Sequence, residues 1–324
     1  MKAVLCKEWG PPESLVIEDI PARDPGPGEV RIRVRAASVN FPDVLIIQNK
    51  YQFKPERPFS PGSEAAGDVI SVGAGVTHVK PGDRVLASTG HGSFAEEVIA
   101  TAAKVVKLPD GLGYDVASAF ILTYGTSWHA LNDRAALKAG ETVLVLGAAG
   151  GVGISAIEIA KARGARVIAA ASTEEKLAVC REHGADETIN YETEDLREGI
   201  KRTTGGKGPD VIYDPVGGKY AEPAFRSIAW RGRYLVVGFA NGEIPRLPLN
   251  LMLLKGASVV GVFWGDYTKR EPAANERDVA EMMALLTAGK LRPHISATSS
   301  LDQVPQALID MANRRVTGKV LIVP

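Results

Sequence analysis

The sequence predicts an α/β protein in two parts, a doubly wound parallel sheet and a small β-barrel. Three observations lead to this fold class. The chain has 324 residues, more than the roughly 250 to 300 that a single hydrophobic core usually serves. Its first part is dense in strand patterns, whereas strand and helix patterns alternate further along. Such alternation is typical of a parallel sheet with helices on both faces.

The β-rich part extends from Lys2 to about Leu108 and is punctuated by Pro-Gly and Gly-Asp turns, which predicts a small barrel. Within residues 30–35, valine and isoleucine alternate with three arginines, so the two kinds of side chain take opposite faces of a strand. We interpret the arginine face as solvated, with an anion site as the alternative. The predicted strands are KAVLC, LVIEDI, EVRIRVRAASV, GDVISVGAGV, GDRVLAS and FAEEVIATAAKVVKL.

A helix pattern, DVASAFILTYGTSWHALND, separates the barrel from the alternating part. Strands and helices then follow one another to about Asp266. Two more helices and a terminal strand complete the chain, and we expect this tail to return to the barrel. The predicted elements after the first helix are ETVLVLG, ISAIEIAKARGA, RVIAAAS, EEKLAVCREHG, ETIN, DVIYDPVGG, YLVVGFA, ASVVGVFW, VAEMMALLTAG, VPQALIDMANRR and GKVLIVP.

The charge balance argues against polyanionic partners. Lys and Arg number 38, as do Asp and Glu, so no long-range field directs the protein to nucleic acid or an anionic membrane. The start MKAVLCKEWG lacks the apolar core of a secretory signal, and no stretch is apolar over the roughly 18 to 20 residues that cross a bilayer. We therefore expect a cytoplasmic protein, with Cys6 and Cys180 as reduced, packed thiols.

A glycine cluster marks the predicted dinucleotide site. It comprises Gly147, Gly150, Gly151, Val152 and Gly153, between a β-branched strand and an amphipathic helix. Residues without a Cβ let the backbone approach a pyrophosphate, and the N-terminal end of the following helix attracts its charge. In this context the pattern predicts a Rossmann-type site, with a glycine-rich packing turn as the alternative.

The end of the next predicted strand indicates NADPH rather than NADH. An acidic residue there would accept hydrogen bonds from a free ribose 2′-hydroxyl. Here RVIAAAS ends in Ser172, and Lys176 follows one helical turn later, so a hydroxyl and an ammonium can meet a 2′-phosphate. Glu174 and Glu175 are close by, but acids are common where a helix begins.

Over essentially its full length the chain resembles the zinc-independent, zeta-crystallin-like quinone oxidoreductases of the medium-chain dehydrogenase/reductase superfamily. The resemblance implies a GroES-like catalytic domain, residues 1–123 and 266–324, a Rossmann NADPH-binding domain, residues 124–265, and a cofactor cleft at their junction. It rests on AASVNFPDVL, PFSPGSEAAGDV, VKPGDRV, LTYGTSWHAL, AAGGVG, YDPVGG and GKVLIVP.

The resemblance also implies that no metal is bound. In the zinc-dependent branch a cysteine occupies the position of Asn40 and a histidine that of Ser63, whereas only Asp43 and Glu64 keep their type here. The five histidines show no paired ligand spacing. Without a Lewis acid, loss of an alcohol proton is poorly supported. Hydride transfer to an electron-poor quinone or conjugated carbonyl needs less help.

Asn40 and Tyr51 are the hydrogen-bond donors we expect at the acceptor oxygen. Asn40 takes a ligand position, and Tyr51 resembles the pocket tyrosine of quinone reductases. The alternatives are a buried amide that holds a loop and an aromatic residue at the barrel rim. We expect Asp43 and Glu64 to order the site, since carboxylates oppose a developing oxyanion.

The resemblance assigns the remaining cofactor contacts and a homodimer. The dimer forms through the last strand of the sheet, in ASVVGVFW. Phe263 and Trp264 have core or interface packing as the alternative. The implied contacts are Thr126 at the carboxamide, Gly150, Gly151 and Val152 at the diphosphate, Ser172, Lys176 and Tyr191 at the adenosine phosphate, and Gly238, Phe239, Ala240, Phe263 and Trp264 beside the nicotinamide.

We therefore predict an NADPH-dependent, zinc-independent quinone reductase. The loop QNKYQFKPERPFSPG, however, carries charge and aromatic residues where substrate choice would be made. Lys50, Lys54 and Arg57 meet either solvent or the phosphates of an acyl thioester. The alternatives are thus a reductase of enoyl thioesters or alkenals, and a non-catalytic NADPH-binding protein.

Overall fold

The computed structural model describes residues 1–324, and its internal contacts divide the chain into two units. Unit 1 comprises residues 1–122 and 293–324, and unit 2 comprises residues 123–292. The first boundary lies one residue from the predicted one. The second lies further along the chain, so residues 266–292 belong to the sheet-containing unit 2 rather than to the barrel.

Three contacts fasten residues 266–292 within unit 2. The Tyr267 ring stacks on His129 at 4.1 Å between centroids. Arg163 and Glu281 approach to 3.8 Å, and the backbone N–H of Arg292 donates to Glu158 at 2.8 Å. The helix pattern VAEMMALLTAG predicted a helix here but not its partners, because helical periodicity gives a buried face without saying what covers it.

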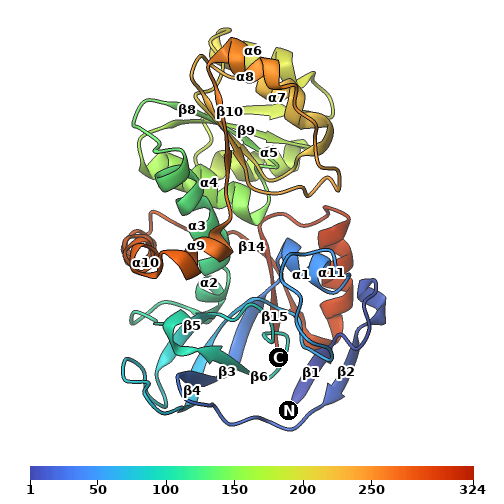
Figure 1. Ribbon diagram of the computed structural model, residues 1–324, viewed down its shortest axis with the longest axis vertical. Helices are drawn as coiled ribbons and strands as arrows, with labels where there is room; N and C mark the ends of the chain where they lie inside the picture. The colour runs from blue at the N-terminus through green and yellow to red at the C-terminus, as the bar shows by residue number, and fades with distance from the viewer. The chain divides into compact units, whose positions relative to one another are not determined.

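Unit 1 is built on a seven-stranded sheet of order β14-β15-β3-β4-β5-β7, with β6 also paired to β3. Its terminal strand β15 runs antiparallel to β3, so the chain end returns to the barrel as expected, and both termini lie in this unit (Figure 1). The strands of unit 1 are β1 (Lys2–Leu5), β2 (Val16–Asp19), β3 (Glu29–Ser38), β4 (Glu64–Val72), β5 (Arg84–Ser88), β6 (Glu97–Thr101), β7 (Val105–Lys107), β14 (Ile295–Ser300) and β15 (Lys319–Val323).

The interior of unit 1 is apolar, as the alternation in β3 predicts. Val30, Ile32 and Val34 are buried in one cluster with residues of β4, β5 and β15. Arg31 and Arg35 form ion pairs with Glu97 and Asp68 instead. The helices of this unit are α1 (Phe41–Ile46), α2 (Tyr114–Ser118), α11 (Val304–Ala312) and the start of α3 (Ile121–Trp128).

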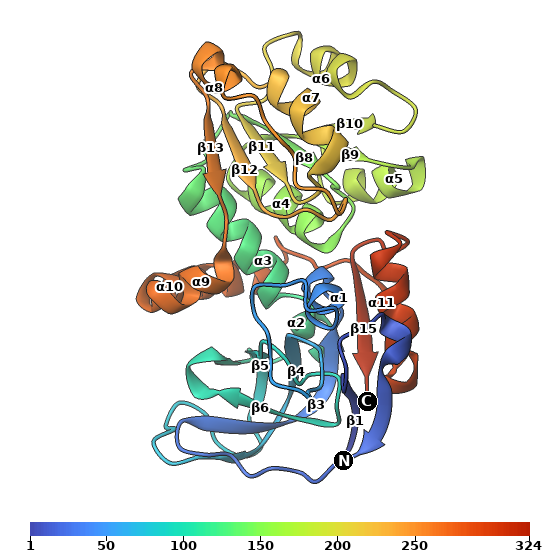
Figure 2. The same ribbon diagram turned by 45° about the vertical axis from the view of Figure 1, so that its right-hand side comes forward.

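Unit 2 contains a six-stranded, fully parallel sheet of order β10-β9-β8-β11-β12-β13. The order reverses between β8 and β11, the position where dinucleotide folds bind their ligand. Figure 2 shows the strands in this order. They are β8 (Thr142–Leu146), β9 (Arg166–Ala171), β10 (Glu187–Asn190), β11 (Val211–Asp214), β12 (Arg233–Val236) and β13 (Ser258–Gly261).

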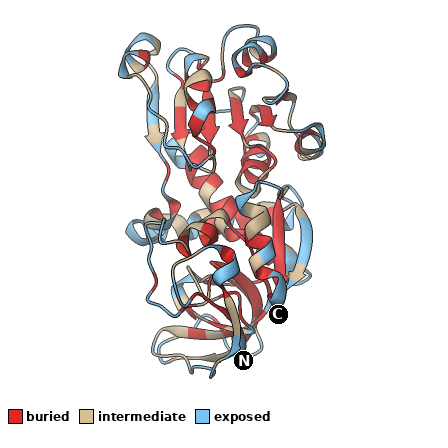
Figure 3. Cartoon of the chain, turned by 90° about the vertical axis from the view of Figure 1, so that its right-hand side faces the viewer, coloured by how far each residue is buried: buried red, intermediate tan, exposed pale blue.

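Helices cover both faces of this sheet, as the alternating pattern predicts. One core cluster joins residues of α6 and α7 to residues of the central strands, and Figure 3 shows the central strands of this sheet in the colour of buried residues. None of the helices in residues 1–324 is both long and apolar enough to cross a membrane. The helices of unit 2 are α4 (Gly151–Ala162), α5 (Glu174–Glu182), α6 (Leu196–Thr204), α7 (Ala221–Arg226), α8 (Leu249–Lys255), α9 (Trp264–Arg270) and α10 (Pro272–Thr287).

Candidate active site

The predicted glycine turn joins β8 to α4. Gly147 follows the last residue of β8 with φ of +58°, a backbone conformation that glycine adopts without strain. A Cβ on Gly147 would lie 2.7 Å from the side chain of Val216. Gly150 is the N-cap residue of α4 and lacks a side-chain cap. The first N–H groups of a helix have no intrahelical acceptor, so this turn presents free donors to an anion.

Gly153 serves packing rather than phosphate approach. A Cβ there would lie 2.5 Å from the carbonyl oxygen of Ala148 and 2.6 Å from that of Gly147. The helix can therefore rest against its own turn only without a side chain at this position. The alternative interpretation of the cluster as a packing turn therefore holds for Gly153. A Cβ on Gly150 would meet no atom closer than the Gly147 carbonyl oxygen at 3.4 Å, an ordinary van der Waals contact.

Ser172, Lys176 and Tyr191 follow neighbouring strands at the same end of the sheet. Ser172 comes directly after β9 and Tyr191 directly after β10, which pairs with β9 in parallel. Both residues and Lys176 are half-buried. The Tyr191 ring packs on Tyr220 at 4.4 Å between centroids. Because β9 and β10 are neighbouring parallel strands, the residues that follow them lie at the same end of the sheet, as the predicted phosphate pocket requires.

The two glutamates beside this pocket do not replace the missing acid. Glu174 is ion-paired with Arg181 further along α5. Thr173 caps α5 by accepting a hydrogen bond from the backbone N–H of Lys176 at 3.3 Å. A backbone hydrogen bond and, to a smaller extent, the Thr173 hydroxyl lower the pKa of Glu175. Both acids are therefore engaged in the first turns of the helix.

The residues expected beside the nicotinamide come from three segments of unit 2. Thr126 is half-buried on α3, and Gly238 to Ala240 follow β12, with Phe239 37% exposed. The predicted strand ASVVGVFW is too long, because β13 ends at Gly261 and Trp264 begins α9. Trp264 is buried, and its indole would lie 2.6 Å from a Cβ on Gly125. This packing favours the core interpretation of Trp264.

Asp214, which the sequence did not single out, shapes the loop next to these segments. It is the last residue of β11 and is 3% exposed. Its carboxylate accepts the N–H groups of Val216 and Gly217, both at 2.8 Å, and the Tyr234 hydroxyl. Burial raises its pKa. The motif YDPVGG contains this aspartate, but its partners become visible only when β11 and β12 pair.

In unit 1, a buried polar network surrounds Asn40, the residue that the resemblance aligns with a zinc ligand. Glu64 is fully buried, and its Oε1 accepts hydrogen bonds from the Ser38 hydroxyl at 2.5 Å and from Asn40 Nδ2 at 3.0 Å. The Lys319 ammonium, 3% exposed, donates to the same oxygen at 3.0 Å and to Asn40 Oδ1 at 2.5 Å. Glu64 Oε2 accepts the N–H of Leu122 at 2.9 Å.

Asn40 is therefore fully engaged within the protein. One amide hydrogen is directed to Glu64 and the other to the Ser38 carbonyl at 3.2 Å, while Oδ1 accepts from Lys319. This arrangement favours the alternative interpretation, a buried amide that holds its loop. Tyr51 is half-buried beside the barrel core. Its pKa is raised by burial and by the Asp43 carboxylate, so it remains a protonated donor near neutral pH.

The donor set does not fit zinc. Asparagine and serine replace the thiolate and imidazole that zinc prefers, and Lys319 already gives positive charge to the oxygens that a cation would bind. No group of three or more His, Cys, Asp or Glu side chains in residues 1–324 could hold a metal ion. The sequence did not point to Lys319, although a lysine in the apolar run GKVLIVP was a signal.

Asp43 lies beside this network, and its pKa is strongly raised. Its carboxylate accepts the Asn40 backbone N–H at 2.8 Å and the Ser63 hydroxyl at 3.0 Å. Burial, opposed by those hydrogen bonds and by the positive charge of Lys319, raises its pKa to about 7. The carboxyl is therefore about half protonated at neutral pH.

This shift predicts a pH-dependent stability. Because the folded pKa of about 7 exceeds the unfolded value of 3.8, the stabilising contribution of Asp43 is full below pH 3.8 and is lost as the pH rises through 7. The loss amounts to roughly 4 kcal/mol. Asp43→Asn, which imitates the protonated carboxyl, should remove this slope. Urea unfolding of both proteins at acidic and alkaline pH measures it, and parallel slopes would contradict the assignment.

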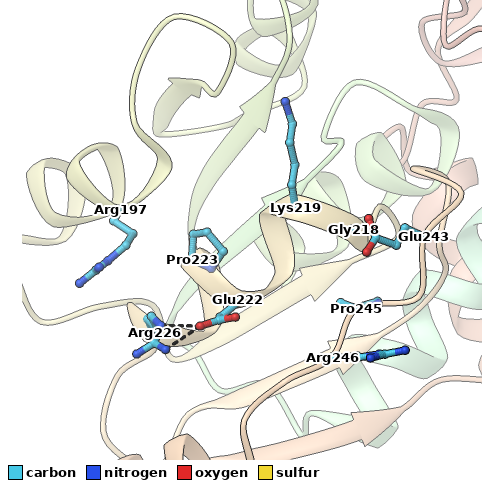
Figure 4. A pocket seen from close by; sticks show the side chains of 9 residues that line it. All are labelled: Arg197, Gly218, Lys219, Glu222, Pro223, Arg226, Glu243, Pro245 and Arg246. Atoms are coloured by element: carbon cyan, nitrogen blue, oxygen red, sulfur yellow. Dashed lines mark hydrogen bonds and ion pairs between the residues drawn. The ribbon is translucent and has the colours of Figure 1, made fainter.

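A separate cavity of about 590 Å³ in unit 2 is not part of this site (Figure 4). Arg226 is ion-paired with Glu222 at 2.6 Å, and the side chains of Arg197 and Lys219 point apart in Figure 4. The cations therefore do not converge on one ligand. None of the predicted cofactor residues lines the cavity, which is bounded by Arg197, Gly218, Lys219, Glu222, Pro223, Arg226, Glu243, Pro245 and Arg246.

Comparisons with known proteins define the class. Residues 26–110 match the family model of the alcohol dehydrogenase GroES-like domain, and residues 151–288 match that of the zinc-binding dehydrogenases. These two domains in this order are those of the medium-chain dehydrogenases and reductases.

Individual relatives narrow the class. The chain is 41% identical to a quinone oxidoreductase-like protein 2 homolog of Nematostella vectensis, over 99% of this chain and 88% of the relative. It is 35% identical to a quinone oxidoreductase of Pseudomonas aeruginosa, over 100% and 99% of the two chains. The solved structure of Escherichia coli quinone oxidoreductase complexed with NADPH is 29% identical, with a TM-score of 0.93 and full coverage of both chains. The chain belongs to the quinone oxidoreductase family.

Proposed function

We propose that this chain is an NADPH:quinone reductase that works without zinc. The observation that carries the proposal is the buried Lys319–Glu64–Asn40 network, in which a lysine ammonium contacts the side chain that the resemblance aligns with a zinc ligand. It occurs in a family member with a fitting dinucleotide turn. The overall change is that NADPH, a proton and a quinone become NADP⁺ and a hydroquinone. Oxidation of one NADPH per benzoquinone reduced by the purified chain tests it, and a ratio far from one contradicts it.

The dinucleotide belongs on the β8–α4 turn. Gly150, Gly151 and Val152 offer backbone N–H groups to the diphosphate, and the α4 N-terminus adds favourable charge. Thr126 takes the carboxamide end. When bound, NADPH supplies the hydride. The remaining contacts of the proposed site are Gly147, Ser172, Lys176, Tyr191, Gly238, Phe239 and Ala240. Trp264, which the resemblance also implies, packs in the core against Gly125, and Phe263 is 51% exposed beyond β13.

The proposed donor to the acceptor oxygen is Tyr51. Hydride transfer leaves negative charge on that oxygen, and a protonated hydroxyl stabilises this charge by donating a hydrogen bond to it. The raised pKa of Tyr51 keeps its proton in place. Asn40 contributes through its loop: its backbone N–H orients Asp43, and its amide fixes Glu64 and Lys319.

A thioester acceptor is less well supported than a quinone. Arg57 lies over the Trp9 ring at 4.8 Å, and Lys50 donates to Gln48 at 2.8 Å. Lys50 is thus engaged within the loop and Arg57 with a ring outside it, and Lys54 is exposed. The arrangement favours the solvated interpretation of the loop charges over a phosphate site.

Cofactor choice gives a prediction. Lys176→Ala should weaken NADPH binding about tenfold or more while changing NADH binding less than about twofold, because one charge-assisted contact to the 2′-phosphate is worth about 1.5 to 3 kcal/mol. Fluorescence titration with both nucleotides measures this. Glu174→Ala, on the same helix, is the matched control. An equal loss of affinity for both nucleotides would show that the phosphate lies elsewhere.

We also propose a homodimer through β13. This strand ends the sheet order, and an unpaired edge readily accepts another strand. Val259 and Phe263 are 41% and 51% exposed, and Leu253 on the neighbouring α8 is 81% exposed. A second copy would extend the sheet and cover these side chains.

A charged substitution tests the dimer. Val259→Lys should convert the dimer to a monomer, because it places an ammonium group in the apolar edge that a second copy would cover. Sedimentation velocity at several concentrations measures the change, with Val323→Lys, at an exposed residue of unit 1, as the control. A wild-type monomer, or a dimer that survives Val259→Lys, would refute this interface.

A further inference from the structure

A chain of ring contacts leads from the barrel core of unit 1 to the surface. Trp9 and Phe59 lie 5.8 Å apart between centroids, Phe59 and His91 6.1 Å, and His91 and Phe53 5.7 Å. Phe59 is 4% exposed, whereas Phe53 is 42% exposed. We call Trp9, Phe59, His91 and Phe53 the aromatic ladder. Its outer end, Phe53, is an apolar ring on a loop and is partly exposed to solvent.

The ladder is attached to the polar network of the same unit. The N–H groups of Thr89 and Gly90 both donate to the carbonyl of Ser63, at 2.9 and 3.2 Å, and the Ser63 hydroxyl donates to Asp43. His91 is the next residue. At the outer end of the ladder, Phe53 is two residues from Tyr51 in the sequence. Ser63 therefore ties the loop that carries His91 to Asp43, and the outer ring of the ladder follows Tyr51 closely in the sequence.

His91 acts in this ladder as a ring. Its Nδ1 is buried without a hydrogen-bond partner, which is uncommon for a buried polar atom. Burial lowers its pKa, so the imidazole is uncharged at neutral pH. Gly90 and Gly92, with φ of +78° and +100°, turn the loop sharply on both sides of it. The loop thus places a neutral ring against Phe53, at an angle of 47° between the two ring planes.

We propose that Phe53, positioned by His91, is a specificity residue that stacks on the ring of a planar cyclic acceptor. Offset stacking of two aromatic rings is favourable beyond the burial of area, whereas an acyclic enal or a thioester chain offers no such face. The inference rests on the proposed quinone reductase activity. It adds that the chain selects quinones by ring contact in unit 1.

The test compares a naphthoquinone with an acyclic enal in steady-state kinetics. Phe53→Leu keeps apolar volume without a ring and should raise KM for the naphthoquinone about fivefold, in the range of aromatic pair energies. The kcat and the KM for the enal should change less than about twofold. Phe53→Tyr, which restores a ring, should behave like wild type. Equal changes in KM for both acceptors, or none, would overturn the proposal.

The positioning role of His91 has its own variants. His91→Phe keeps the ring contact and should leave KM for the naphthoquinone near wild type, whereas His91→Ala should imitate Phe53→Leu. Urea unfolding of each variant separates this effect from a loss of folding. If the wild type reduces no quinone, the proposed function fails; binding of a non-reducible naphthol to wild type and Phe53→Leu, by calorimetry, then decides the ring subsite. Equal affinities in that titration refute it.

Discussion

Lys319→Met should lower the free energy of unfolding by about 3 to 5 kcal/mol. The substitution removes the only ammonium in contact with Glu64, a carboxylate that is fully buried. An uncompensated buried charge costs far more than the net worth of the ion pair. Methionine keeps most of the volume of lysine, so the effect reports charge rather than packing. Urea unfolding at neutral pH measures it.

Two controls make this result specific. In Lys319→Met combined with Glu64→Gln, no charge is left unpaired, and much of the lost stability should return. Lys107→Met removes an ion pair with Asp83 at 2.9 Å in the same unit, but Lys107 is 57% exposed, so this change should cost less than about 1 kcal/mol. If Lys319→Met costs no more than Lys107→Met, the buried network does not carry the stability assigned to it.

Two alanine substitutions in the glycine turn should separate binding from packing. Gly150→Ala should fold like wild type, since its φ of −77° suits any residue and its nearest contact is 3.4 Å away. Its methyl group would occupy the space through which the pyrophosphate approaches. The Kd for NADPH should therefore rise at least about tenfold, a loss of about 1.4 kcal/mol.

Gly153→Ala should instead destabilise the fold. Its Cβ would overlap two backbone carbonyl oxygens, at 2.5 and 2.6 Å, and such overpacking costs about 1 to 3 kcal/mol. Fluorescence titration and urea unfolding of both variants measure the contrast. Unchanged NADPH affinity in Gly150→Ala would mean that the nucleotide does not lie on this turn.

The sequence predicted the features that depend on local pattern. The β8–α4 turn, its flanking strand and helix, and Ser172 after β9 stand where periodicity and glycine spacing placed them. The resemblance also anticipated the family, which the relatives bear out. These features are local because the backbone needs of a phosphate turn are met within a few residues.

Local sequence patterns do not predict contacts between residues that lie far apart in the chain. Lys319 lies far along the chain from Glu64 and Asn40, and only the pairing of β15 with β3 brings them together. Asp214 likewise finds Tyr234 only through the parallel pairing of β11 and β12. The donor role that the sequence predicts for Asn40 illustrates the consequence, because the local pattern around Asn40 does not indicate the lysine that donates to its amide oxygen.

Acceptor-dependent oxidation of NADPH decides whether this chain is a quinone reductase. The purified chain should consume NADPH with a benzoquinone faster than with a crotonyl thioester or a simple enal, and faster with NADPH than with NADH. Tight binding of NADPH without turnover of any of the three acceptors would exclude this activity and indicate a nucleotide-binding protein instead.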